Sequence, residues 1–137
     1  MKNRFGKQTT LERLPDAELE VMLVLWQADR PMKAVELRDA LAERHDWQKA
    51  TVQVLLNRLC ERGFAAAETE RNYKLFRPLV SEEAYRASES STLMRKLCRG
   101  SLGTLVASLI STGELDEKDF EELEEILRVG KRGDRRD

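Results

Sequence analysis

The sequence predicts a mainly α-helical protein that carries one short β-hairpin. Two observations lead to this prediction. Before residue 63, apolar residues recur every three or four positions in three segments, which is the spacing of one helix face. Two short runs with strand character follow, and after Val80 the apolar residues recur only at helical spacing. We therefore expect three short helices, a hairpin and a second group of helices, in that order.

The composition is typical of a small protein with strongly solvated surfaces. The chain has 137 residues, of which 41% are hydrophobic and 36% are charged, against about 25% charged residues in typical domains. Its longest uncharged stretch, 100–113, is shorter than the roughly 20 apolar residues that span a bilayer. Cys60 and Cys98 are too few for a disulfide framework. We expect a cytoplasmic protein with no membrane insertion and no secretory signal.

The first two helices are predicted around an interrupting proline. A first helix is expected over residues 15–28, where Pro15 suits the first turn. Its apolar stripe consists of Leu19, Met22, Leu23 and Trp26. Pro31 breaks this pattern, so a second, short helix is expected from about residue 34 to 44.

A third helix and a hairpin complete the first lobe. The third helix is expected over residues 49–62, with Gly63 suited to end it. Two short strands are expected over 64–68 and 74–79, joined by a polar turn at 69–73. Three short helices followed by a hairpin is the element order of a winged helix-turn-helix, the fold that we predict here.

The chain is expected to divide into four parts. A flexible arm, 1–13, precedes the winged helix-turn-helix domain at 14–80. A helical dimerisation domain follows at 81–130, and a charged, frayed tail at 131–137. The first eighty residues carry a slight excess of basic side chains and the remainder an excess of acidic ones, which places nucleic-acid binding in the first domain.

The second domain is predicted to contain three helices. Ser81 is expected to cap the first, which continues to about Arg99 and ends at Gly100. Gly113 ends the second helix, and Asp116 caps the third. The apolar side chains of the last two helices are more than fifty residues can easily bury alone. We predict that they form a homodimer interface: Leu102, Leu105, Val106, Leu109, Ile110, Phe120, Leu123 and Leu127. Packing on the first lobe of the same chain is the alternative.

Enzymatic chemistry is not predicted. His45 is the only histidine, and the sequence has no nucleophile elbow and no glycine-rich phosphate loop. The carboxylate pairs within residues 121–125 fit a solvated helix face. Cys60, Cys98 and His45 lack metal-ligand spacing, so no metal and no cofactor are expected.

The exposed face of the third helix has the chemistry of a DNA-reading surface. The major groove accepts one α-helix whose outward side chains are polar or small. The amides of Gln53 and Asn57 can pair with adenine, and Ala50 and Val54 can touch thymine methyl groups. Groups suited to the DNA backbone lie at the helix edge and on the hairpin: Lys49, Thr51, Arg58, Arg71, Asn72, Tyr73 and Lys74. We predict that both groups of residues bind double-stranded DNA. An ordinary solvated helix face is the alternative.

Several segments of the chain resemble one repressor family. They are Leu14–Met22, Trp26, Trp47, Thr51–Leu59, Gly63 and Phe76–Ser81. Together they resemble the BlaI/MecI family of penicillinase and methicillin-resistance repressors, over roughly residues 12–128. The resemblance implies a homodimeric winged-helix repressor on a palindromic operator that controls β-lactamase or related resistance genes. It assigns base reading to Lys49, Ala50, Thr51, Gln53 and Asn57, with Arg71 on the wing.

The resemblance also implies a mode of induction. In that family, the signal of a membrane sensor-protease leads to cleavage of an Asn-Phe bond in the dimer domain. The matching bond here joins Ser108 and Leu109, a departure from that pattern, and a regulatory protease is the implied partner. No cysteine-rich motif like that of the copper-responsive branch follows Cys98. Val54 stands where better-known members carry threonine.

Two other functions are consistent with the sequence. A winged-helix protein-interaction module would use the same surface against a protein and be indifferent to DNA. A metal- or redox-responsive repressor would depend on Cys60 and Cys98, so replacing both by serine would abolish its response.

Overall fold

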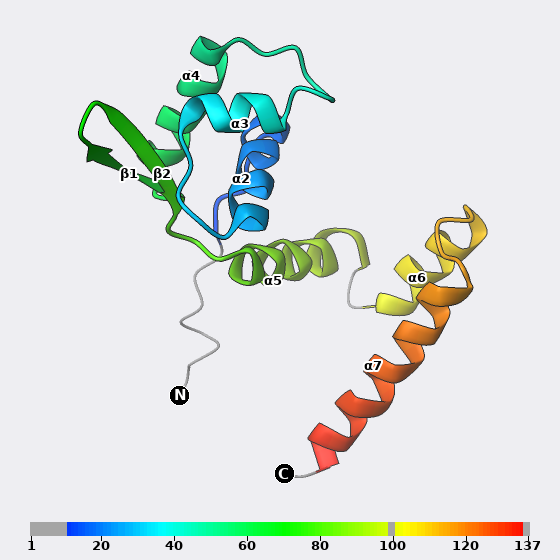
Figure 1. Ribbon diagram of the computed structural model, residues 1–137. Coiled ribbons are helices and arrows are strands. Elements are labelled where there is room, and N and C mark those ends of the chain that lie inside the picture. The colour runs from blue at the N-terminus through cyan, green and yellow to red at the C-terminus, as the bar shows by residue number, and fades with distance from the viewer. Residues whose placement is uncertain (1–10, 99–100, 136–137) are drawn as a thin grey trace. The chain divides into compact units, whose positions relative to one another are not determined.

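The structure is a computed structural model that describes residues 11–98 and 101–135 (Figure 1). It contains two compact units, which divide between Ser91 and Thr92. The first contains α2 (Asp16–Ala28), α3 (Ala34–Ala40), α4 (Lys49–Glu61), β1 (Ala65–Glu70) and β2 (Tyr73–Pro78), and α5 (Glu82–Leu93) runs across the division. The second contains a π-helical turn η1 (Met94–Cys98), α6 (Leu102–Ser111) and α7 (Glu117–Arg135). The predicted mainly helical fold with one hairpin is confirmed.

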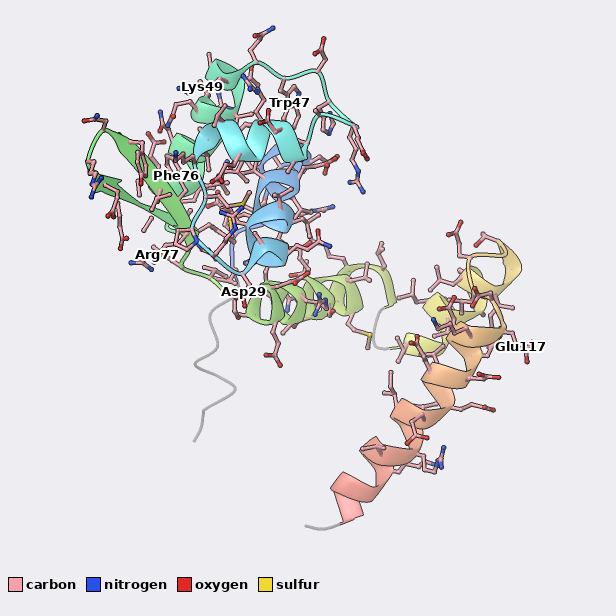
Figure 2. The ribbon with its side chains drawn as sticks, in the orientation of Figure 1. Asp29, Trp47, Lys49, Phe76, Arg77 and Glu117 are labelled. Carbon is pink, nitrogen blue, oxygen red and sulfur yellow. The ribbon has the colours of Figure 1, made fainter. Side chains whose placement is uncertain are left out.

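Apolar faces of α2, α3 and α4 form the core of the first unit. Its fully buried side chains include Val21, Met22, Leu25, Leu37, Val52, Leu56 and Leu59. In α2 the buried face differs from the predicted stripe: Leu23 is 40% exposed, Leu19 and Trp26 are half-buried, and Val21 and Leu25 are buried beside Met22. Phe76 from β2 closes the core on the hairpin side (Figure 2). Tyr85 from α5 packs edge-on against Phe64, with ring centroids 5.7 Å apart. Because Tyr85 belongs to this core, the compact unit continues to Ser91, past the boundary at residue 80 expected from the sequence.

The helices of the first unit begin and end mainly where the sequence predicts. Gly63 follows α4 with a φ of +84°, the left-handed conformation that a residue after a helix commonly adopts. The second helix is shorter than expected, since α3 ends at Ala40 and residues 41–44 form a turn. Leu41 is buried at the end of α3, but Ala42–Arg44 are exposed, so no buried apolar side chain beyond Leu41 stabilises a further helical turn.

The hairpin is longer and its turn tighter than predicted. The antiparallel register runs from Ala65 opposite Pro78 to Glu70 opposite Tyr73, which leaves only Arg71 and Asn72 in the turn. Thr69, Glu70 and Tyr73 were also expected in the turn, but they pair in the strands. Strand pairing satisfies their backbone donors and acceptors. A short bridge adds Met32 to the sheet: its N–H donates to Phe76 O at 2.9 Å, and Phe76 N–H donates to Met32 O at 2.7 Å.

The helix from residue 82 is not continuous to Arg99. Ser81 caps it as predicted, because its Oγ accepts from Ala84 N–H at 3.0 Å. The α-helix ends at Leu93, and the chain takes π-helical geometry from Met94 to Cys98. Ser90, Ser91 and Thr92 precede this change, and such residues favour helix interiors weakly because their hydroxyls compete for backbone groups.

In the second unit, α7 is capped as predicted and extends further than predicted. Asp116 and Asp119 each accept the other's backbone N–H, at 2.9 and 3.0 Å. The helix continues to Arg135, whereas a frayed tail was expected from residue 131. A basic C-terminal end favours this extension because it compensates the negative helix end, and each of the two glycines, Gly130 and Gly133, costs only about 1 kcal/mol. Within the described residues, no helix is both long and apolar enough to cross a bilayer.

Most of the predicted flexible arm lies outside the described residues, but its last three residues are held against the first unit. Leu11 N–H donates to Ser88 Oγ at 2.9 Å. Arg13 lies 3.6 Å from the carboxylate of Glu89. Glu12 pairs with Arg62 at the end of α4. These residues are therefore part of the folded unit and correct the expectation of an arm that is mobile to residue 13.

A buried ion pair joins α2 to the end of α4. Glu18 is 1% exposed, and its carboxylate accepts from Arg62 Nε at 2.6 Å. The pairing to Glu18, followed by that to Glu12, raises the pKa of Arg62 above its ordinary value. A buried carboxylate without a cation is costly, so Arg62 is required where Glu18 is buried.

Replacement of Arg62 by methionine is expected to lower the free energy of unfolding by about 2–4 kcal/mol, since it leaves the buried Glu18 carboxylate without its partner. Urea unfolding followed by circular dichroism measures this. Glu12→Gln is the matched control, because it removes only the exposed partner and should cost less than about 1 kcal/mol. Equal losses in both variants would contradict a special role for the buried pair.

Candidate nucleic-acid interface

The helix α4 separates apolar and polar faces as the sequence predicts. Val52, Leu55, Leu56 and Leu59 are buried in the core. The opposite face is open to solvent or half-buried and carries the predicted reading residues: Lys49, Ala50, Thr51, Gln53, Val54, Asn57 and Arg58. Val54 is the one large aliphatic side chain among them and is 47% exposed. The structure thus presents these residues together on one accessible helix face.

Two amides at the centre of this face are already paired. Gln53 Nε2 donates to Asn57 Oδ1 at 3.0 Å, across one helical turn. The pair leaves an amide oxygen on Gln53 and an amide NH₂ on Asn57 directed at other partners. One acceptor beside one donor is the complement of the major-groove edge of adenine.

The hairpin tip holds an arginine in an unusual backbone conformation. Arg71 has a φ of +58°, a region in which side chains other than glycine, asparagine and aspartate are uncommon. All residues from Ala67 to Lys74 are exposed, so burial of Arg71 does not explain its presence. A strained, exposed cation at a wing tip fits a binding role.

Arg71→Gly is expected to raise the free energy of unfolding by about 0.5–1 kcal/mol, because glycine adopts positive φ without strain. The same variant should bind DNA about 3- to 10-fold more weakly, since a phosphate-contacting cation is lost. Thermal unfolding tests the expected gain in stability, and a binding titration tests the expected loss of DNA affinity. Asn72→Gly, at a position of ordinary φ, should not stabilise the protein. A loss of stability in Arg71→Gly would refute the strain argument.

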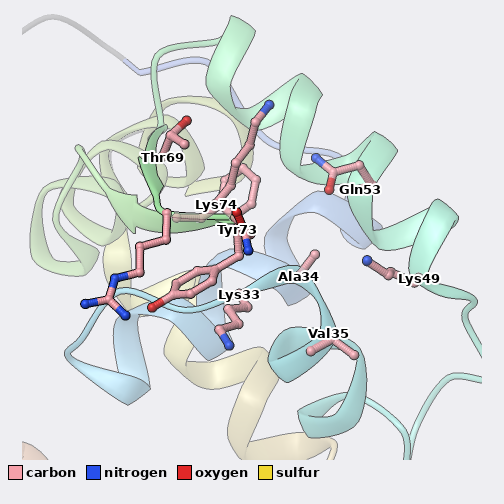
Figure 3. A pocket seen from close by; sticks show the side chains of 11 residues that line it. Lys33, Ala34, Val35, Lys49, Gln53, Thr69, Tyr73 and Lys74 are labelled. Atoms are coloured by element: carbon pink, nitrogen blue, oxygen red, sulfur yellow. The ribbon is translucent and has the colours of Figure 1, made fainter.

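A cleft lies between α4, the start of α3 and the hairpin (Figure 3). Its volume is about 350 Å³, and its lining includes Ala34, Val35, Gln53, Thr69, Asn72 and Phe76. The charged side chains that line it are all basic: Lys33, Lys49, Arg71 and Lys74. Sequence reasoning missed Lys33, which precedes α3. The sequence feature that could have indicated it is a lysine shortly after Pro31, at the predicted start of the second helix. Only the fold shows that this helix start lies next to the hairpin.

The loop before α4 is held by a small cluster around His45. The His45 and Trp47 rings stack with centroids 4.0 Å apart, and His45 Nε2 lies 3.2 Å from Glu20 Oε2. His45, with a further contribution from Arg44, holds the pKa of the Glu20 carboxyl below its ordinary value. The interpretation of His45 as a residue that shapes the turn agrees with this geometry.

Cys60, the cysteine whose side chain the structure describes, shows no arrangement for a reactive centre. Cys60 is half-buried, and burial raises the pKa of its thiol, so the reactive thiolate is scarce at neutral pH. The side chain of Cys98 lies outside the described residues. Within the described part of the chain, no group of three histidine, cysteine, aspartate or glutamate side chains is placed to hold a metal ion.

The predicted dimerisation residues all lie on α6 and α7 and are not buried within the chain. Leu102, Ile110, Phe120 and Leu127 are 38–61% exposed, and Leu105, Val106, Leu109 and Leu123 are half-buried. The bond between Ser108 and Leu109 lies inside α6, and Ser108 Oγ donates to Thr104 O at 3.1 Å. Cleavage of this bond requires local unwinding of α6, because proteases bind extended chains.

Comparison with known proteins identifies relatives along almost the whole chain. The family model described as penicillinase repressor matches residues 14–129. The chain is 26% identical over 121 residues to the penicillinase repressor of Bacillus licheniformis, covering 88% of this chain and 94% of that protein. It is 25% identical over 114 residues to the methicillin resistance regulatory protein MecI of Mammaliicoccus sciuri, covering 83% of this chain and 92% of that protein.

Solved structures include a similar DNA-binding domain. The solution structure of the monomeric form of B. licheniformis BlaI in complex with the blaP half-operator is 29% identical, with a TM-score of 0.47, and covers 55% of this chain and 90% of that one. The match of the family model to most of the chain agrees with the segments that carried the sequence resemblance. The chain belongs to the penicillinase repressor family, which includes the BlaI and MecI repressors.

Proposed function

We propose that this protein is a sequence-specific DNA-binding transcriptional repressor that acts as a homodimer on a palindromic operator. The observation that supports it best is the juxtaposition of two kinds of group around one cleft. The Gln53 amide, which is paired with Asn57, lines this cleft from α4, and basic side chains line it from α4, from the hairpin and from the start of α3. An α4 helix in the major groove would bring the wing to the adjacent phosphates.

The proposed target genes follow from the relatives. The similar proteins are named as penicillinase and methicillin-resistance repressors. We propose that this chain likewise controls β-lactamase or related resistance genes, in the cytoplasm, where an operator is accessible. The residues proposed to bind DNA remain those predicted from the sequence.

The apolar side chains of α6 and α7 support the proposed homodimer. None of the described side chains in the second unit is buried, although α6 carries a continuous apolar stripe. A second copy of the same surface would remove these groups from water and give the two-fold symmetry that matches a palindrome.

We also propose that induction occurs by proteolysis within the dimerising unit. Cleavage at Ser108–Leu109 would divide the α6 stripe and separate Leu109, Ile110 and all of α7 from the DNA-binding unit. The two α4 helices of the dimer would then no longer be linked, and operator binding would lose its bivalent contribution.

A gel-shift titration tests the proposed function. The full chain is titrated against DNA from upstream of its own gene and its neighbours, with random DNA as competitor, at two salt concentrations. We expect a retarded band that survives the competitor and an affinity that falls steeply with salt. Footprinting of that band then locates the operator.

The same experiment can refute the proposal. If folded, dimeric protein gives no specific band on any of these fragments, the exposed α4 face is not a DNA-reading surface. The protein-interaction module would then be the better account of that surface.

A further inference from the structure

The side chain of Lys33 makes a specific contact with the hairpin. Its ammonium nitrogen lies 4.1 Å from the centroid of the Tyr73 ring. This is cation–π geometry, in which the negative face of the ring attracts the cation. Lys33 stands immediately before α3, and Tyr73 is the first residue of β2, directly after the turn. The contact therefore joins the helix-turn-helix to the tip of the wing.

The backbone on the Lys33 side of the contact is fixed. Met32, the preceding residue, exchanges two hydrogen bonds with Phe76, whose side chain is buried in the core. The Lys33 N–H donates to the Glu36 carboxylate at 2.8 Å, which lowers the pKa of Glu36. Lys33 is thus held in place by the sheet and by the first turn of α3.

The tip of the wing has no comparable anchor in the core. Residues 67–74 are all exposed, and a two-stranded hairpin is only marginally stable by itself. Phe76 is the last buried residue of β2 on the way to the tip. Beyond it, the Lys33–Tyr73 contact is a direct link from a fixed backbone to the turn that carries Arg71.

We infer that Lys33 is a positioning residue for the wing. Its ammonium holds the Tyr73 ring, and this fixes the tip so that Arg71 and Lys74 approach the DNA backbone while α4 reads the major groove. This inference rests on the proposed function and adds to it. A positioning role is distinct from a direct contact between Lys33 and a DNA phosphate. A direct contact would release one more counterion and so steepen the dependence of log Kd on log salt.

The first measurement needs no DNA. In nuclear magnetic resonance spectra of the full chain, the Lys33 Hε protons should be shifted upfield by the Tyr73 ring current. Lys33→Gln should raise the amide hydrogen exchange rates at Asn72–Lys74 about 2- to 5-fold, because loss of an exposed cation–π contact changes the opening equilibrium by about that factor. Exchange rates in α4 should stay unchanged. Lys49→Gln, which removes a cation that lines the same cleft from α4, is the matched control and should not change exchange at the tip.

The second measurement uses operator DNA. Lys33→Gln should weaken binding about 2- to 5-fold in the wild type and by the same factor in a Tyr73→Phe background, because phenylalanine keeps the ring. In a Tyr73→Leu background the same substitution should have almost no further effect. The dependence of log Kd on log salt should keep its slope.

Two sets of results would overturn the inference. Equal effects of Lys33→Gln in the Tyr73→Phe and Tyr73→Leu backgrounds, with a slope reduced by about one, would make Lys33 a phosphate ligand. An unshifted Hε resonance with unchanged tip exchange would show that the contact does not hold the wing. Failure of the proposed function looks different, because the wild-type chain itself would then not select operator DNA.

Discussion

Simultaneous replacement of Gln53 and Asn57 by alanine is expected to weaken operator binding by about 30- to 1,000-fold, which corresponds to about 2–4 kcal/mol. The two amides form one hydrogen-bonded pair on the exposed face of α4. Each free amide group of that pair is placed to meet a base edge, and a good bidentate base contact contributes about 1–3 kcal/mol of discrimination. Affinity for random DNA should change little, because no cation is removed.

Competition titrations measure the ratio of the affinity for operator DNA to the affinity for random DNA in each variant. The single variants should not add up, since removal of either amide also breaks the Gln53–Asn57 hydrogen bond. Glu61→Gln, in the last turn of the same helix, controls for a general effect of substitution in α4. If operator and random DNA lose affinity equally, these amides do not read bases.

Conversion of Leu105 and Leu109 to aspartate is expected to give a monomer that binds the full operator about 100-fold or more weakly than the wild type. Both residues lie on the apolar stripe of α6 and are half-buried within the chain. Two charges at a dimer interface would have to be desolvated without partners, which opposes association. Loss of the second recognition helix then removes the bivalent contribution to binding.

Sedimentation equilibrium and a half-site titration test this second prediction. The wild-type mass should be twice the 15.8 kDa of the chain, and the variant mass should equal it. Ala107→Asp places the same charge on the opposite side of α6 and should leave the dimer intact. The variant should keep wild-type affinity for an isolated half-site, because the core described for the first unit lies between Leu14 and Tyr85. A wild-type chain that sediments as a monomer would refute the proposed assembly.

The local features of the fold were predictable because they depend on short spacings. Apolar residues three or four positions apart mark the buried face of α4, and Gly63 marks its end. In α2 the same spacing exists, but the structure buries Val21, Met22 and Leu25 in place of most of the predicted stripe. The polar face of α4 follows from the same periodicity, because residues opposite a buried stripe must face outward. The residues expected to read DNA could therefore be named from the sequence, and the structure presents them on one accessible surface.

The boundaries of the second helix and of the hairpin turn were less predictable. The helix was expected to continue to residue 44, but no side chain after Leu41 is buried there, so the structure decides where α3 ends. Likewise, polar residues around Arg71 and Asn72 are typical of a turn, and only strand pairing shows which of them lie in it.

The contacts that hold the proposed interface together are seen only in the tertiary structure. Glu18 meets Arg62 across 44 positions, Leu14 N–H donates to the Tyr85 hydroxyl across 71, and Lys33 meets Tyr73 across the cleft. By itself, the sequence determined the helices, the hairpin, their order and the face of α4 that is open to a ligand. The tertiary structure decided which distant side chains meet, where the first unit ends and how the wing is held. The physical reason is that periodicity records which side of an element is buried, whereas a contact between distant residues also depends on how the elements pack.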